Sequence, residues 1–227
     1  MIMLRATGLR KEFTLHLQGG VRLPVLDGFG LTVRAGECVV LAGPSGAGKT
    51  TVLRSLYGTY RLADGEILVR HRGVMTDIAN RAAGHERQVM EVRRETVGYV
   101  SQFLRVVPRI SALAIVTEAG AGAASAAAAL LDRLDIPARL QGLPPATFSG
   151  GEQQRVNLAR GFIGQHPVLL LDEPTASLDA TRRDVVIELI REAKARGTAI
   201  IGIFHDAHMR DAVADTLISV QVLQDAA

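Results

Sequence analysis

Apolar and polar residues alternate along residues 21–42, and this stretch ends in the apolar run Cys38-Val39-Val40-Leu41, directly before a glycine-rich segment. Alternation with a period of two is typical of β-strands, so we expect strands that lead into a turn. Residues 48–57, which follow the glycines, are expected to form a helix. The pattern therefore predicts a strand, a tight loop and a helix in succession.

The middle of the chain, residues 61–95, is polar and rich in arginine. The pair Asp64-Gly65 is a turn signal, and the short apolar run that follows it, residues 66–69, predicts a strand. We expect this region to be an antiparallel excursion from the core. Further on, residues 119–134 contain the alanine-rich tract 123–131, which favours helix but carries few side chains that could do chemistry.

The C-terminal third repeats the spacing of strand and helix. Residues 168–171 predict a strand, 181–195 a helix, 199–204 a second strand, and a short helix follows. Strands that alternate with helices are typical of a parallel sheet with crossover helices. The pattern as a whole predicts an α/β fold.

The composition is that of an ordinary globular protein. With 48% hydrophobic and 22% charged residues, 227 residues can bury a sizeable core in one compact unit. The net charge is only +3 and the basic residues are spread along the chain, so we expect no nucleic-acid binding. Cys38, the single cysteine, lies in an apolar run and is expected to be a small buried side chain, which fits a reducing cytoplasm.

No apolar stretch approaches the roughly 20 residues that cross a bilayer. The N-terminal residues MIMLRATGLRKEF contain repeated charges and lack the pattern of a signal peptide. We therefore expect no direct membrane insertion, and membrane association only through a partner.

Residues 43–50 match the pattern G-x-x-x-x-G-K-[ST] of a phosphate-binding loop. Its glycines let backbone N–H groups surround phosphates, and the N-terminus of the following helix favours anions. Lys49 is expected to reach the outer phosphates and Thr50 a magnesium ion. The alternative is a glycine-rich turn that holds no ligand. The predicted nucleotide-binding residues of this loop are Gly43, Pro44, Ser45, Gly46, Ala47, Gly48, Lys49, Thr50 and Thr51.

Two adjacent carboxylates, Asp172 and Glu173, end the apolar run of residues 168–171. The pleat of a strand sends neighbouring side chains to opposite sides unless the strand ends between them. Phosphoryl transfer needs a magnesium ion and a positioned water, so Asp172 suits the metal and Glu173 the general base. Alone the pair is a weak signal, because acidic residues also open loops and cap helices. Together with the upstream phosphate-binding loop it becomes a strong one.

The segment Ser149-Gly150-Gly151-Glu152 predicts a helix start, with Ser149 and Glu152 forming a capping box. The two glycines also expose backbone donors at a helix N-terminus, which predicts a second anion site far from the first in sequence. Two anion sites and one nucleotide suggest a shared interface.

With these segments the chain resembles the ATP-binding cassette (ABC) ATPases over nearly its whole length. Three further positions match the family in order: Gln102 resembles the metal-sensing glutamine, residues 177–179 the loop that joins two sites, and His205 the switch histidine. Gln102 and His205 would be ordinary structural residues without this order. The resemblance implies ATP and Mg²⁺ as cofactors, with Lys49, Glu173 and His205 catalytic, and with Thr50, Gln102 and Asp172 at the metal.

The resemblance also implies how the site is assembled. Two cassettes of this family dimerise head to tail, and each ATP lies between the loop of one chain and the signature of the other. Ser149, Gly150, Gly151 and Asp179 would then contact the nucleotide. Phe13 stands where family members place an aromatic that stacks on adenine, although it could equally pack against the core.

The family implies a P-loop NTPase fold of the ABC type, a RecA-like core with an antiparallel β subdomain and an α-helical subdomain. We expect one domain over residues 1–227, in which about 1–108 and 160–227 form the core and β subdomain. Residues from about 109 to 159 would form the helical subdomain.

Within the family, four stretches resemble the L-subunit group of the bacterial carbon–phosphorus lyase system for phosphonate use. They lie at residues 19–43, 97–113, 147–162 and 189–206. This narrower resemblance implies a cytoplasmic chain that dimerises with itself or a related ABC subunit and works with the other lyase subunits through Phe103 to Ile110. It implies support for forming a ribose alkylphosphonate triphosphate.

Two other functions are open. The first is the ATP-binding subunit of a membrane transporter of the lipoprotein-releasing or macrolide-exporting kind. The second is a scaffold that uses ATP only as a dimerisation clamp, against which Lys49, Glu173 and His205 argue.

Overall fold

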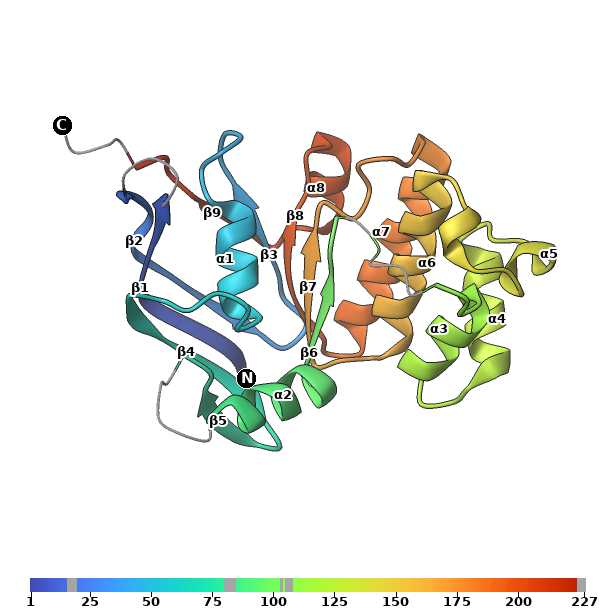
Figure 1. Ribbon diagram of the computed structural model, residues 1–227, viewed down its shortest axis with the longest axis horizontal. Helices are drawn as coiled ribbons and strands as arrows, with labels where there is room; N and C mark the ends of the chain where they lie inside the picture. Colours follow the sequence, from blue (N-terminus) through green and yellow to red (C-terminus); the bar gives the residue numbers. More distant parts are fainter. Residues whose placement is uncertain (16–19, 80–84, 103, 105–107, 224–227) are drawn as a thin grey trace.

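Two β-sheets form the framework of the protein (Figure 1), which we describe from a computed structural model covering residues 1–15, 20–79, 85–102, 104 and 108–223. The first sheet is antiparallel, in the order β2-β1-β4-β5. Its strands are β1 (Ile2–Leu15), β2 (Val21–Arg34), β4 (Asp64–His71) and β5 (Val74–Asp77). The second is parallel, in the order β6-β7-β8-β3-β9. Its strands are β3 (Cys38–Ala42), β6 (Val97–Val100), β7 (Val168–Asp172), β8 (Ala199–Ile203) and β9 (Thr216–Ser219).

The helices pack on the parallel sheet and beside it (Figure 1). Four helices lie in the connections between strands along the chain: α1 (Lys49–Leu56), α2 (His85–Glu95), α7 (Ala180–Ala195) and α8 (Ala207–Val213). The others fill the excursion between β6 and β7: α3 (Ala112–Ala119), α4 (Ala124–Arg133), α5 (Ala138–Gln141), the 3-10 turn η2 (Pro145–Thr147) and α6 (Gly150–Ile163). All except the end of α6, which continues to Ile163, lie in the predicted helical region of about 109–159, whose subdomain boundaries stay a prediction.

The parallel sheet separates two hydrophobic clusters, and the strand period decides which residue joins which. In β7, Leu169 and Leu171 pack with α3, α4, α6 and α7, while Val168 and Leu170 pack with α1 and the antiparallel sheet. All four side chains are almost fully buried. Because both faces of the inner strands β3, β7 and β8 are covered, these strands are apolar along nearly their whole length, as is typical of parallel sheets, whereas the edge strand β9 is mostly exposed.

The structure confirms the predicted α/β class and most of the predicted elements. One expectation was incomplete: the polar region 61–95 contains the antiparallel strands β4 and β5 but also the helix α2. This helix buries little except Val92, and Val89 packs partly against the same cluster, so its apolar stripe is too narrow to dominate the pattern.

The turn signal Asp64-Gly65 was also wrong as a turn, because both residues begin β4. Gly65 has φ 104°, and a Cβ there would lie 2.7 Å from the carbonyl oxygen of Gly8 on β1. This glycine therefore permits the close approach of two strands rather than a chain reversal.

The alanine-rich tract 123–131 forms helix α4, as its composition favours, and a break separates α4 from the preceding helix α3. The break falls at Gly120 to Ala123, where Ala121 has φ 53° and Gly122 has φ 88°. None of the helices in the described ranges is long and apolar enough to cross a bilayer alone; α3 and α4 pass that test only as a pair bent by 117°.

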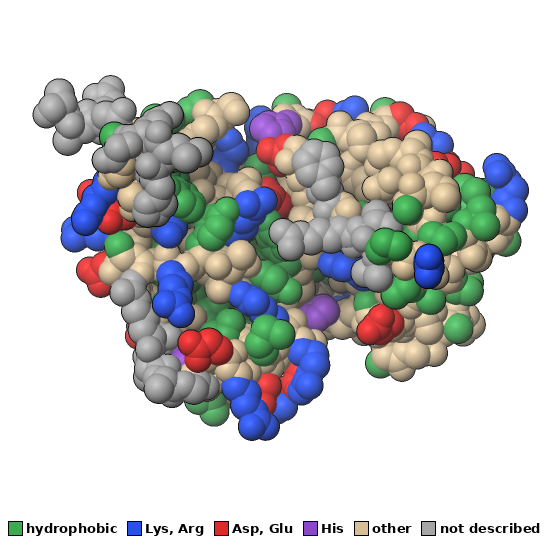
Figure 2. All heavy atoms as spheres, viewed as in Figure 1, with side chains coloured by type: hydrophobic (Ala, Val, Ile, Leu, Met, Phe, Trp, Pro, Cys, Tyr) green, Lys and Arg blue, Asp and Glu red, His purple; other side chains and the backbone are tan. Residues whose placement is uncertain are grey.

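Charged side chains are mixed over the visible surface. Lysine and arginine are interspersed with aspartate, glutamate and apolar groups over the face shown in Figure 2. This face does not have the single basic patch that is typical of nucleic-acid binding.

Cys38 is fully buried in β3, as predicted, and its backbone N–H donates to the Asp215 carboxylate at 2.7 Å. Burial raises the pKa of the Cys38 thiol to about 12. At pH 8 only about one thiol in 10⁴ would be the reactive thiolate, and the sulfur is shielded as well.

We therefore expect native protein at pH 8 to react with Ellman's reagent only as fast as it unfolds. The same protein in guanidinium chloride should react stoichiometrically within the mixing time. The absorbance of the released thionitrobenzoate measures both reactions. Rapid stoichiometric reaction of the native protein would contradict the buried position of Cys38.

Candidate active site

The phosphate-binding loop lies between the end of β3 and the start of α1, as predicted (Figure 1). Gly43, Gly46 and Gly48 have φ of 142°, 80° and 91°. Other residues adopt these values with strain, and a side chain at Gly43 would overlap the carbonyl of Val220. Helix α1 begins at Lys49, and its N-cap Gly48 makes no side-chain cap hydrogen bond, so no capping side chain occupies the first N–H groups of the helix. The loop thus has the geometry of an anion cradle.

Lys49 places its ammonium group at the mouth of this loop. The Nζ atom donates to the carbonyl oxygens of Gly43 and Pro44, both at 2.8 Å. The side chain is nearly buried, with 8% of the residue exposed, although Ser45 and Gly46 in the same loop are exposed. A positive charge is therefore held where a phosphate in the loop would lie.

Asp172, the last residue of β7, accepts hydrogen bonds on both carboxylate oxygens. Thr50 Oγ1 donates to Oδ1 at 3.0 Å, and the hydroxyl of Tyr99 donates to Oδ2 at 2.6 Å. Asp172 is 2% exposed. The structure thus brings together Thr50 and Asp172, two residues assigned to the metal from 122 positions apart.

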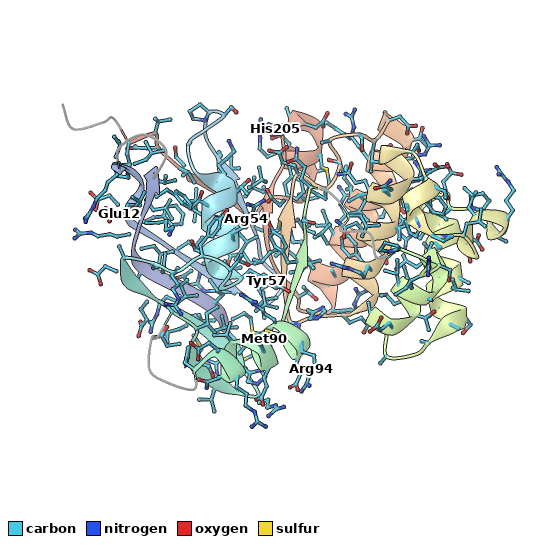
Figure 3. All side chains as sticks on the ribbon, viewed as in Figure 1. Glu12, Arg54, Tyr57, Met90, Arg94 and His205 are labelled. Carbon is cyan, nitrogen blue, oxygen red and sulfur yellow. The ribbon has the colours of Figure 1, made fainter. Side chains whose placement is uncertain are left out.

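Glu173 lies just beyond the strand and faces a different set of groups. Its φ of 51° is left-handed, so the chain turns between the two carboxylates. His205 Nε2 lies 2.7 Å from Oε1, and Gln102 Nε2 donates to Oε2 at 3.1 Å. His205 follows β8 and is exposed, on the same edge of the sheet (Figure 3). Three predicted site residues therefore meet at one point.

The donor set fits magnesium. The hydroxyl of Thr50 and the carboxylate of Asp172 are hard oxygen ligands, and Gln102 and Glu173 add further oxygens nearby. Among the described residues no group of three or more His, Cys, Asp or Glu could hold a metal by itself. Mg²⁺ bound to nucleotide needs no such group, because phosphates and waters supply most of its ligands. The ion would neutralise charge on the phosphates.

Ser149 caps α6 as predicted, and the capping box is complete. Its Oγ accepts from Glu152 N at 3.3 Å, and the Glu152 carboxylate accepts from Ser149 N at 2.8 Å. Ser149 and Gly150 are exposed. In Figure 1, α6 and α1 lie on opposite sides of β8, β7 and β6. One chain therefore does not bring its own signature segment to its own phosphate-binding loop.

Asp179 and Phe13 make other contacts in the described structure. Asp179 caps α7 by accepting from Arg182 N at 2.9 Å. Phe13 lies on β1, with its ring edge-on to Tyr60 at 5.3 Å and the Lys11 ammonium 4.6 Å from its centroid. Contact of either residue with a nucleotide stays a prediction.

Sequence reasoning missed Gln154, which links the signature helix to the carboxylates. This glutamine is 4% exposed. Its Nε2 donates to the carbonyl of Glu173 at 2.9 Å, and its Oε1 accepts from the N–H and hydroxyl of Ser177. Gln154 lies near the start of a helix, and nothing in the local sequence indicates that its side chain contacts Glu173 and Ser177.

Arg183 and Tyr99 were also missed. Arg183 donates to the carbonyl of Leu178 at 2.9 Å and pairs with Asp206 at 2.5 Å, so it ties the loop before α7 to the residue after His205. Tyr99 lies on β6, three residues before Gln102. The sequence does not reveal how β6 pairs with β7, so it could not show that Tyr99 reaches Asp172.

Comparisons with known proteins identify the family. A family model described as "ABC transporter" matches residues 26–176. The chain is 34% identical over 215 residues to the lipoprotein-releasing system ATP-binding protein LolD of Syntrophotalea carbinolica, covering 91% of this chain and 90% of that protein. It is 36% identical over 220 residues to the hemin import ATP-binding protein HmuV of Streptomyces coelicolor, covering 94% of this chain and 73% of that protein.

The fold also matches solved structures. The dimeric ATP-binding cassette MJ0796, solved in a post-hydrolysis state with ADP and Pi, superimposes with a TM-score of 0.83 at 22% identity. The alignment covers 96% of this chain and 94% of that one. These comparisons do not support the narrower resemblance to a carbon–phosphorus lyase subunit, since the relatives named above are transporter components. This chain is an ATPase cassette and belongs to the ABC transporter family.

Proposed function

We propose that this chain is the ATP-hydrolysing subunit of a membrane transporter, acting on the cytoplasmic face of the membrane as a dimer. The observation that carries the proposal is the convergence of Gln102, Glu173 and His205 beside the loop that holds Lys49. The transporter assignment is supported by the names of the relatives, LolD and HmuV.

In this mechanism each chain of the dimer contributes its phosphate-binding loop to one ATP site and its signature segment to the other. Lys49 and the loop N–H groups would bind the phosphates, while Thr50 and Asp172 would hold a magnesium ion. Glu173 accepts the proton of the attacking water, and His205 and Gln102 orient its carboxylate. The exposed Gly150 and the half-buried Gly151 would bind the ATP of the second chain, since they lie away from their own loop.

A carbon–phosphorus lyase role rests on the sequence stretches alone. Half of the predicted docking segment Phe103 to Ile110, residues 103 and 105–107, lies outside the described ranges. A soluble lyase partner is therefore the outcome that would replace the transporter assignment.

The first test of the proposal is Glu173→Gln. We expect steady-state phosphate release to fall about 10²- to 10⁴-fold, because the base is lost, while ATP binding persists. The removal of one negative charge from the closed site should also favour an ATP-bound dimer in size-exclusion chromatography.

The matched comparison is Lys49→Ala, which removes a charged hydrogen-bond donor to the phosphates. Its affinity for a fluorescent ATP analogue should fall about 10- to 100-fold. If Glu173→Gln hydrolyses ATP at the wild-type rate, Glu173 is not the base.

The second test concerns the partner. Affinity purification of the tagged chain from detergent-solubilised membranes should recover an integral membrane protein in stoichiometric amount. Cells grown with a phosphonate as sole phosphorus source serve as the comparison. Recovery of soluble lyase subunits from those cells, with no membrane protein in either preparation, would overturn the transporter assignment.

A further inference from the structure

Tyr99 approaches the magnesium-holding carboxylate from the neighbouring strand. It lies on β6, which pairs in parallel with β7, and its hydroxyl donates to Asp172 Oδ2 at 2.6 Å. Thr50 donates to the other oxygen at 3.0 Å. Two donors from two different elements thus fix the two oxygens of one buried carboxylate.

These two hydrogen bonds set the rotation of the carboxylate. The hydroxyl of Thr50 has one proton, and it is directed to Asp172 Oδ1. The lone pairs of the Thr50 oxygen therefore stay available to a cation. Rotation of the carboxylate about its Cβ–Cγ bond would break both contacts. The Tyr99 hydroxyl thus keeps Oδ1 turned toward Thr50.

The ring of Tyr99 is itself held in place. It stacks on Tyr57 of α1, with centroids 5.1 Å apart and planes at 24°. The guanidinium of Arg93 lies 4.8 Å from the Tyr57 centroid, and its Nε donates to the Tyr57 carbonyl at 2.8 Å. Tyr57 is the C-cap residue of α1, directly after Leu56. The hydroxyl therefore has little freedom to leave Asp172.

Two charged side chains, Asp172 and Arg54, interact with Tyr99. Burial, and after it the Asp172 carboxylate, raises the pKa of Tyr99 above its usual range. Arg54 interacts with both Tyr60 and Tyr99, and these contacts raise the pKa of its guanidinium. The hydrogen bond from Tyr99 to the Asp172 carboxylate is charge-assisted, which makes it stronger than a bond between neutral groups.

We propose that Tyr99 is a positioning residue for magnesium, whose hydroxyl orients Asp172 so that the metal-facing oxygen is presented beside Thr50. The proposal rests on the proposed role of Asp172 at the metal. Hydrogen-bond partners that orient a metal-binding carboxylate commonly change metal affinity about 10- to 100-fold when removed.

The test is Tyr99→Phe, which keeps the ring and its stack on Tyr57 but removes the hydroxyl. Magnesium is titrated into protein with a fixed concentration of fluorescent ATP analogue, and the half-saturating concentration is read from the fluorescence. We expect it to rise about 10-fold or more. Nucleotide affinity in EDTA should be unchanged, since Tyr99 does not contact the loop.

The matched control is Tyr57→Phe, which removes a hydroxyl from the stacked ring without touching Asp172 and should leave the magnesium requirement unchanged. Melting temperatures without magnesium measure any structural effect separately. A wild-type magnesium requirement in Tyr99→Phe, whatever its melting temperature, overturns the proposal.

Asp172→Asn separates the two levels of the argument. If Asp172→Asn raises the magnesium requirement and Tyr99→Phe does not, only the role of Tyr99 is wrong. If neither variant changes it, the proposed role of Asp172 fails and the role of Tyr99 fails with it.

Discussion

The end of β7 is the constraint on which the site depends. The strand stops between Asp172 and Glu173, and Glu173 takes a left-handed φ of 51°. A continued strand would send the two carboxylates to opposite faces of the sheet. Because the chain turns instead, Asp172 stays buried against Thr50, while Glu173 faces His205, which follows the neighbouring strand β8. Two like charges in sequence therefore take different partners and different tasks.

The same turn connects the site to the signature helix. Gln154 of α6 donates to the backbone carbonyl of Glu173 and accepts from Ser177. These hydrogen bonds join α6, whose N-cap is Ser149, to the backbone of the proposed general base. Arg183 extends the connection to Asp206, beside His205. A movement of α6 would thus shift the backbone of Glu173 in the same chain. This is a physical basis for communication between two sites that lie at different ends of one cassette.

The sequence patterns predicted the local features, and the family resemblance grouped the distant residues of the metal and the base, but contacts outside the family motifs were missed. The loop at residues 43–50 and the capping box at Ser149 are short-range patterns, and both are present as predicted. Helix α2 was missed because its buried stripe is little more than Val92. Tyr99 and Gln154 were missed for a different reason. Their partners are set by strand register and helix packing, which a single sequence does not encode locally.

The central claim is that one chain supplies two half-sites, and subunit mixing tests it most directly. Lys49→Ala disables the loop, and Gly150→Asp places a negative charge on the exposed signature, where an added side chain meets no neighbouring atom. Each variant alone should be inactive. Mixed in equal amounts, they should form heterodimers with one intact composite site and recover roughly a quarter of wild-type ATP hydrolysis. Activity of the mixture no greater than that of either variant alone would contradict the account.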